Sequence, residues 1–238
     1  MISIDTVYQK VLNFASKEQR GYITPQEFNL FANQAQLEIF EQYFYDLNQA
    51  RRKPNNETVY ADADDILEAK LQQFEAVDGA AVVSGWVGAG GGGINKQVPG
   101  YVYRINRVEL NQVKCEILNT TDFNDIHQGS PLLKPTNTRP VVNIRHGIMR
   151  CRADGSNLVT PTGVFYFRLP VSPMWNYFVV SGKALYNSND SVDFELHPSE
   201  EVELVYKILK FAGVSMQRTD IMQAGQGMET MQVQQEKQ

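Results

Sequence analysis

The chain of 238 residues is poor in the side chains that usually carry reactive chemistry. It has two cysteines, Cys115 and Cys151, and three histidines, His127, His146 and His197. Two cysteines are too few for a disulfide framework or a closed zinc site. No histidine stands at i, i+4 spacing from another histidine or a cysteine. We therefore expect no metal centre and no cofactor, with both cysteines in the core as small apolar side chains.

Sequence signals for a serine hydrolase and for membrane insertion are also missing. No Gly-x-Ser-x-Gly nucleophile elbow occurs. No window approaches the roughly 18 apolar residues that a membrane helix needs. Residues 1–9 lack a positive run followed by an apolar block, so we expect no secretory signal.

The Gly-rich run at residues 88–93 does not match a phosphate-binding loop. Such a loop needs a lysine and a hydroxyl residue that open a helix directly after the glycines. Here Pro99 and a β pattern follow. Because successive glycines leave the backbone loose, the run is better interpreted as a flexible tip or hinge.

The charge balance disfavours a general nucleic-acid coat. Lys and Arg number 22 against 27 Asp and Glu, which gives a net charge of -5. Arg104, Arg107 and Lys114 lie near Tyr101 and Tyr103 in a predicted strand region. Basic and aromatic residues on strands can bind single-stranded nucleic acid, but the pattern is more typical of a solvated sheet face.

Apolar residues at three- and four-residue steps predict four helices. The expected first helix covers 4–15, and the second runs from Thr24 to about residue 53. Its start is a capping box, Thr24-Pro25-Gln26-Glu27, with proline in the first turn. The fourth begins at Pro198 and stops at Gly213.

The third helix follows a polar loop over 55–63. Asp62 or Asp64 is its expected cap, and Val77 closes its buried face. Asp78-Gly79 is expected to end it.

The long second helix is apolar over most of its circumference, which indicates cover from more than one side. The second cover is either another subunit or the rest of a monomer in which this helix is central. The first reading gives a subunit interface formed by Phe28, Phe31, Phe40, Phe44 and Leu47.

From about residue 80 to 186, β-branched and alternating runs predict short, mostly antiparallel strands. Their expected ranges are 97–108, 113–118, 140–145, 148–152, 163–169 and 177–181. His146-Gly147 and Ser181-Gly182-Lys183 are the expected tight turns. Aromatic rings on both faces of the strand around Trp175 to Phe178 are typical of an interface core, and also of a β-rich core.

Together these patterns predict an α+β fold in which N- and C-terminal helices form a bundle. The expected parts are a helical bundle over 1–79 plus 197–213, an inserted β-rich domain over 80–196, and an extended tail over 214–238. The tail cannot bury a core of its own. Unbranched thioethers fit irregular grooves, so its apolar residues are candidates for docking a partner: Met216, Ile221, Met222, Met228 and Met231.

Three segments resemble virion structural proteins of short-tailed bacteriophages, in particular the crAss-like phages of Bacteroidota. They are Arg20 to Asn29, Leu169-Pro170 with Pro173 to Tyr177, and Phe194 to Glu201. The layout is similar to head–tail adaptors that form a ring beneath the portal. The resemblance implies a dodecameric ring around the DNA channel, with the tail docked on a neighbouring ring.

The leading hypothesis is therefore a non-enzymatic connector subunit, made in the host cytoplasm and located in the virion neck or tail. It would contact other copies of itself, the portal or adjacent tail rings, and passing DNA without specific binding. The alternative is a glycan-binding tail module that uses exposed Trp86, Trp175 or Tyr101 as sugar platforms. A third hypothesis is an enzyme whose site is assembled from the distant histidines.

Overall fold

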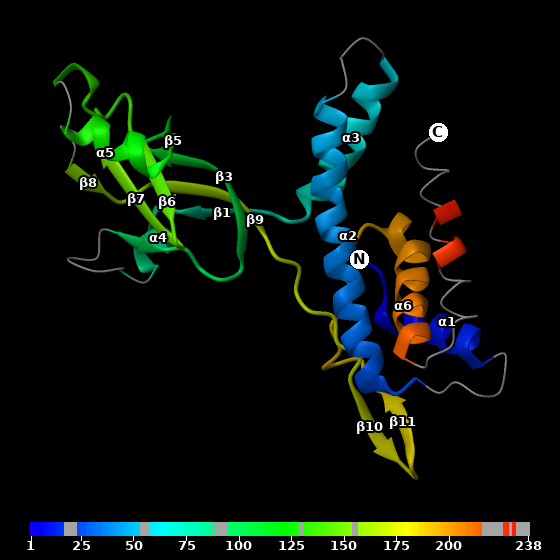
Figure 1. The fold of residues 1–238 in the computed structure, drawn as a ribbon. Helices are drawn as coiled ribbons and strands as arrows, with labels where there is room; N and C mark the ends of the chain where they lie inside the picture. The colour runs from blue at the N-terminus through cyan, green and yellow to red at the C-terminus, as the bar shows by residue number, and fades with distance from the viewer. Residues whose placement is uncertain are drawn as a thin grey trace. The chain divides into compact units, whose positions relative to one another are not determined.

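A computed structural model describes residues 1–16, 23–52, 58–86, 88, 95–128, 131–153, 157–215, 226–228 and 230–231. The chain divides into two compact units, drawn in Figure 1. Unit 1 comprises residues 1–73 and 170–238, and unit 2 comprises residues 74–169. The mixed α+β class expected from the sequence is confirmed. Residues 170–196, which the sequence pattern assigned to the β-rich part, belong to unit 1.

Unit 1 contains the long helices and one hairpin. Its elements are α1 (Ile4–Ser16), α2 (Pro25–Arg52), α3 (Thr58–Gln72), β10 (Tyr177–Val180), β11 (Lys183–Tyr186), the short 3-10 helix η2 (Pro198–Glu200) and α6 (Glu201–Ser215). Helix α2 packs against α3 and α6, and α1 packs against α6 (Figure 1). No helix among the described residues is both long and apolar enough to cross a membrane.

The start of α2 follows the predicted capping box. The Thr24 Oγ1 atom accepts from the Glu27 amide at 3.3 Å, and a Glu27 carboxylate oxygen accepts from the Thr24 amide at 3.0 Å. The hydrogen bonds from Thr24 hold the pKa of Glu27 below its usual value. The carboxylate therefore stays charged at the positive end of the helix dipole.

The prediction for the third helix is wrong at both ends. Helix α3 begins at Thr58, so Asp62 and Asp64 lie inside it and residues 58–63 are helical rather than part of a loop. It ends at Gln72, and Glu75–Gly79 form strand β1 with Val77 exposed. Strand β1 pairs antiparallel with β9 (Gly163–Arg168), roughly ninety residues further along the chain. A local apolar pattern carries no information about so distant a partner.

Unit 2 consists of two small sheets and short helices. Its remaining elements are α4 (Ala80–Gly85), β2 (Lys96–Gln97), β3 (Val102–Leu110), β4 (Val113–Lys114), β5 (Glu116–Leu118), α5 (Thr120–Gln128), the 3-10 helix η1 (Pro131–Leu133), β6 (Val141–Arg145), β7 (Ile148–Ala153) and β8 (Asn157–Val159). One sheet has the order β1-β9-β3-β4, and the other β2-β7-β6-β5 with β8 paired to β7. Only the β5–β6 pair is parallel among the described strands, so the mostly antiparallel prediction is confirmed.

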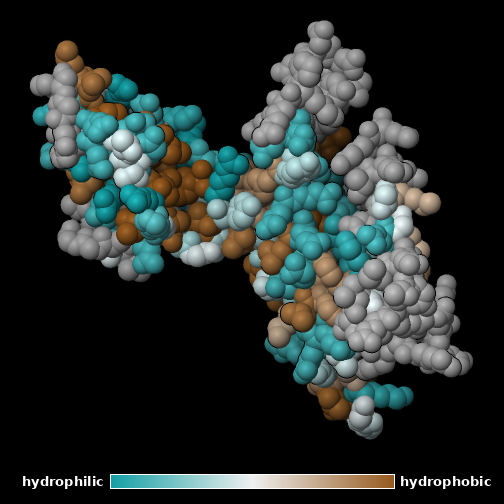
Figure 2. All heavy atoms as spheres, viewed as in Figure 1, coloured by the Kyte–Doolittle hydropathy of each residue, from teal (hydrophilic) through white to brown (hydrophobic). Residues whose placement is uncertain are grey.

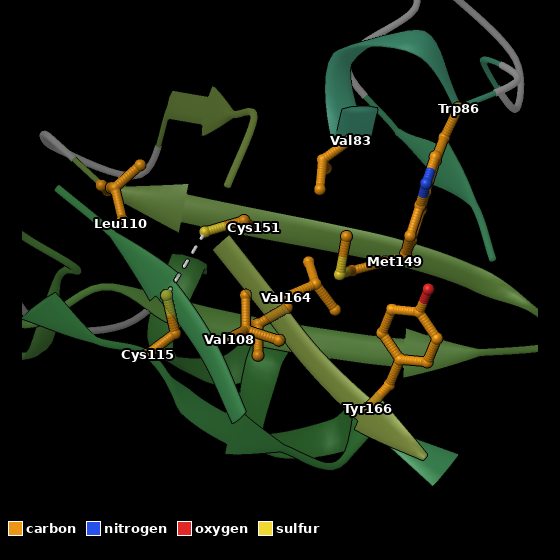
Figure 3. Packing of buried hydrophobic residues seen from close by; sticks show 11 residues of the cluster. Val83, Trp86, Val108, Leu110, Cys115, Met149, Cys151, Val164 and Tyr166 are labelled. Carbon is orange, nitrogen blue, oxygen red and sulfur yellow. Dashed lines mark hydrogen bonds between the residues drawn. The ribbon is translucent and has the colours of Figure 1, made fainter. Parts of the chain in front are cut away.

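The apolar core of unit 2 is seen from close by in Figure 3. Its buried members include Val83, Val108, Met149 and Val164, together with both cysteines. The first sheet contributes Val108 and Val164 from β3 and β9, and the second contributes Met149 from β7. Residues of both sheets therefore share one core.

Two predicted tight turns are confirmed. His146 and Gly147 connect β6 to β7 with φ of 51° and 69°, and Ser181 and Gly182 connect β10 to β11 with φ of 51° and 77°. Positive φ at both central positions is the requirement of the two-residue turn whose twist matches that of its strands. Glycine at the second position meets it without strain.

Candidate functional site

Most of the residues that the sequence assigned to a subunit interface lie inside unit 1. The buried ones are Phe28, Phe40, Phe44 and Leu47, while Phe31 is half-buried. Phe28 packs edge-on against Tyr8 of α1 at 4.8 Å, and Phe31 stacks with Phe211 of α6 at 6.5 Å. The chain's own helices therefore cover this face of α2, and these residues offer a second copy little surface.

The predicted docking tail is described only in part. Met216, Ile221 and Met222 lie outside the described residues. Met228 and Met231 are exposed and lie in short helical stretches, 226–228 and 230–231, rather than in extended chain. Helix α6 also continues two residues past the predicted stop at Gly213.

The segment between unit 2 and α6 is fixed to α2 by side-chain amides. Asn29 binds both backbone groups of Trp175: its Oδ1 accepts from the Trp175 amide at 2.8 Å, and its Nδ2 donates to the Trp175 carbonyl at 3.1 Å. Gln36, fully buried, donates to the Val171 carbonyl at 2.8 Å and accepts from the Glu195 amide at 3.0 Å. Each side-chain amide donates one hydrogen bond to the backbone of the segment and accepts one from it, as a backbone amide does in a β-sheet.

Trp175 anchors the base of the β10–β11 hairpin. Its ring is buried, and its indole N–H donates to Asp5 Oδ1 of α1 at 3.0 Å. Tyr177 and Tyr186 stack on it from the two strands with centroid distances of 5.7 and 5.8 Å. One indole therefore joins the hairpin to α1 through a hydrogen bond and to both strands through ring contacts.

Beyond this base the hairpin exposes apolar side chains on both faces. Opposite residues of an antiparallel pair share a face, so Phe178 and Leu185 lie on one face and Val179 and Ala184 on the other. We call the four exposed large residues the hairpin surface: Phe178 (50% exposed), Val179 (65%), Val180 (47%) and Leu185 (45%). In Figure 2, hydrophobic side chains reach the surface at the end of unit 1 where Figure 1 places the hairpin.

The outer backbone edges of the hairpin also bear on what it can bind. Among the described strands, none besides these two joins the β10–β11 sheet. A two-stranded hairpin is at best marginally stable alone, and an open apolar edge is a template for pairing with another chain. The hairpin surface is therefore the candidate interaction site. The sequence signal for it is Tyr177-Phe178-Val179-Val180, an apolar run without alternation directly before a Ser-Gly turn.

The tryptophans are not available as sugar platforms. Trp175 is 3% exposed and Trp86 7%, so the prediction that they present open ring faces is wrong. The Trp86 indole N–H donates to Asp78 Oδ2 at 3.2 Å. The exposed Tyr101 donates to the same oxygen at 3.3 Å, and Tyr166 donates to Asp78 Oδ1 at 3.2 Å. Asp78 thus acts as an acceptor for three aromatic side chains, and Tyr101 is the one proposed sugar platform that is exposed.

The three histidines occupy separate elements. His127 lies in α5, and His146 lies in the exposed β6–β7 turn. His197 caps η2 in unit 1, where its Nδ1 accepts from the Ser199 amide at 3.3 Å. Within the part of the chain that the structure describes, no group of three or more His, Cys, Asp or Glu side chains is placed to hold a metal ion.

Among the basic residues of β3, Arg107 has partners within the chain. Arg107 pairs with Glu109, and its guanidinium lies 5.7 Å from the centroid of the Phe165 ring. Arg104 and Tyr103 are exposed on the same strand. This arrangement is that of a solvated sheet face. Of the Gly-rich run, only Gly88 is described, and it forms a β-bridge with Lys96.

A comparison with models of known protein families finds no match, and a comparison with curated protein sequences finds none either. The candidate site is therefore defined by its geometry.

Proposed function

We propose that the chain is a non-enzymatic structural protein of a phage virion, and that it forms a ring in the head–tail connector below the portal. The observation that carries the proposal is the hairpin surface, an exposed apolar part of unit 1 to which no further described strand pairs. Apolar patches of this kind on a soluble chain mark contacts with other proteins. The resemblance to crAss-like phage proteins supplies the kind of assembly.

Two of the segments that resemble crAss-like phage proteins contact each other in the structure. Asn29 belongs to the first of the resembling segments and Trp175 to the second, and the two are joined by two hydrogen bonds. The segments that suggest the family are thus the ones that hold the hairpin in place. In the proposed ring of 12 copies, the hairpin of one subunit packs on the next subunit and adds its open edge to that subunit's surface.

The remaining features of the proposal are consistent with this role. The helices form the bundle that builds the ring wall, unit 2 is an inserted β domain, and the tail reaches the portal or an adjacent tail ring. A net charge of -5 suits a channel that lets genomic DNA slide past without specific binding. The subunit is made in the host cytoplasm and is located in the virion.

The proposal is tested by comparing two matched substitutions. Val179 of the hairpin is 65% exposed and Leu30 of α2 is 68% exposed, so Val179→Asp and Leu30→Asp each place one carboxylate on an exposed aliphatic position of unit 1. We expect rings of the wild-type chain in electron micrographs and a large species in sedimentation. Val179→Asp should lose that species with an unchanged circular dichroism spectrum, and Leu30→Asp should keep it.

Two results contradict the proposal in different ways. A wild-type chain that stays monomeric at high concentration, alone and with a portal protein, removes the connector function. Wild-type rings that Val179→Asp forms equally well keep the ring and remove the hairpin as its contact.

A further inference from the structure

The two cysteines of unit 2 lie against each other. Cys115 and Cys151 are both free and buried, and their Sγ atoms are 3.9 Å apart, within hydrogen-bond distance for thiols. Figure 3 shows the two side chains pointing toward one another across the core. The two cysteines are 36 residues apart in the sequence, and the sequence pattern predicts that each is a core residue without predicting their contact.

The position of Cys115 gives the contact a structural consequence. Cys115 is the single residue between β4 and β5, and these strands belong to different sheets. Cys151 lies in β7, in the same sheet as β5. A covalent bond between the two sulfurs would therefore tie the crossover between the sheets to the middle of the second sheet.

We propose that Cys115 and Cys151 are a site of intramolecular disulfide formation that a small-molecule disulfide oxidises, and that the bond locks the crossover between the two sheets of unit 2. The Cys115 thiolate attacks the small disulfide, forming a mixed disulfide and releasing one small thiolate. Cys151 then attacks Cys115 Sγ, its proton passes to the released thiolate, and the second small thiolate leaves and takes from solvent the proton that Cys115 had given up. The two cysteine thiols are oxidised to one disulfide while one small disulfide is reduced to two thiols.

The surroundings of the sulfurs favour this order of attack. The hydrogen bond with Cys151 lowers the pKa of the Cys115 thiol, whereas that contact and burial raise the pKa of Cys151. The thiolate is the attacking form. Cys115 also lies between strands of two and three residues, and its neighbours Lys114 and Glu116 are exposed. Short strand ends open more readily than the middle of a sheet, so a small reagent reaches Cys115 first.

The test treats the folded full-length chain with oxidised glutathione and analyses it by mass spectrometry without reduction. We expect a monomer lighter by about 2 Da, a peptide containing Cys115 linked to one containing Cys151, and no free thiol after unfolding. The unfolding transition of unit 2 should rise by about 10 °C, because the cross-link restricts the unfolded chain. Retention of both thiols, under conditions that oxidise the same chain in denaturant, would overturn the proposal, as would a disulfide only between chains.

Two single variants test the order of attack. Cys151→Ala should retain glutathione on Cys115, because the second sulfur is missing, and Cys115→Ala should leave Cys151 unmodified. Neither variant should gain thermal stability from the oxidant. Equal modification of the two variants would overturn the assignment of Cys115 as the attacking thiol.

Discussion

Helix α2 and the β10–β11 hairpin are both rich in aromatic and branched apolar side chains, and both belong to unit 1, yet their surroundings are opposite. Phe40 of α2 is 0% exposed and packs edge-on against Phe44 at 5.1 Å. Phe178 of the hairpin is 50% exposed, and its neighbours Val179 and Val180 are exposed too. The helix is covered by its own chain, while the outer part of the hairpin lacks such cover within the described residues.

The difference shows what an apolar sequence pattern can and cannot predict. A wide apolar face requires cover, because leaving large side chains in water costs about 1.5–3 kcal/mol each. The pattern does not identify which chain supplies the cover. For α2 the cover includes α6, which lies about 150 residues further along the same chain. Surplus apolar surface is therefore evidence for a partner only after the chain's own packing is known.

The largest expected effect on stability comes from truncating the buried Phe40 side chain of α2. Phe40→Ala removes a fully buried side chain and leaves a cavity, so the free energy of unfolding should fall by about 3–5 kcal/mol. Denaturant unfolding followed by circular dichroism measures it. Tyr45→Ala, at a 59% exposed position on the same helix, is the control and should change stability by about 0.5 kcal/mol or less. Equal losses in the two variants would mean that α2 is not covered as described.

A smaller effect is expected where the helix holds the hairpin. Asn29→Ala removes both hydrogen bonds to the Trp175 backbone. The loss leaves a partly buried amide and carbonyl unpaired, which costs about 1–3 kcal/mol. Hydrogen exchange should quicken at residues 177–186 before it quickens elsewhere. Asn29→Asp keeps the acceptor for the Trp175 amide and loses the donor, so its loss should lie between those of wild type and alanine.

If hydrogen exchange at the hairpin is unchanged in Asn29→Ala, the stability of the hairpin does not depend on its hydrogen bonds to α2. Trp175 would then be held by the hydrogen bond to Asp5 and by ring contacts with Tyr8, Tyr177 and Tyr186. The exposed hairpin and the covered helix would then be energetically independent.

The parts of the fold that the sequence predicted are those defined by near neighbours. The Thr24–Glu27 capping box and the His146-Gly147 turn each depend on a few consecutive residues, and both are present. Strand β1 was missed because its register is set by β9. The hairpin was assigned to the β-rich part because its link to the helices passes through Asn29 and Asp5, 146 and 170 residues from Trp175.

The candidate site was predicted less well than the fold, for a related reason. The exposure of Phe178 could not be predicted, because a strand with rings on both faces has the same sequence whether it lies in a core or on a surface. The cysteine contact was missed because Cys115 and Cys151 meet only through the packing of two sheets. Both features depend on tertiary packing.

The smallest expected effect on stability comes from replacing a phenylalanine of the hairpin by alanine. Phe178→Ala removes the same atoms as Phe40→Ala, but half of this ring is already in water. The free energy of unfolding of the unassembled chain should therefore change by about 0.5 kcal/mol or less. Denaturant unfolding at low protein concentration, where the chain is dispersed, measures it beside Phe40→Ala.

The dependence on protein concentration also distinguishes the Phe178→Ala variant from the Phe40→Ala variant. If the hairpin surface is covered by a neighbouring subunit, the cost of Phe178→Ala should grow with concentration, because association stabilises the wild-type chain by mass action. The cost of Phe40→Ala arises within one chain, so it should appear in full at the lowest concentration. A large and concentration-independent loss in Phe178→Ala would place that ring in a core of its own chain. Phe178 and Phe40 would then have the same kind of surroundings, and the hairpin would not be an exposed surface at that residue.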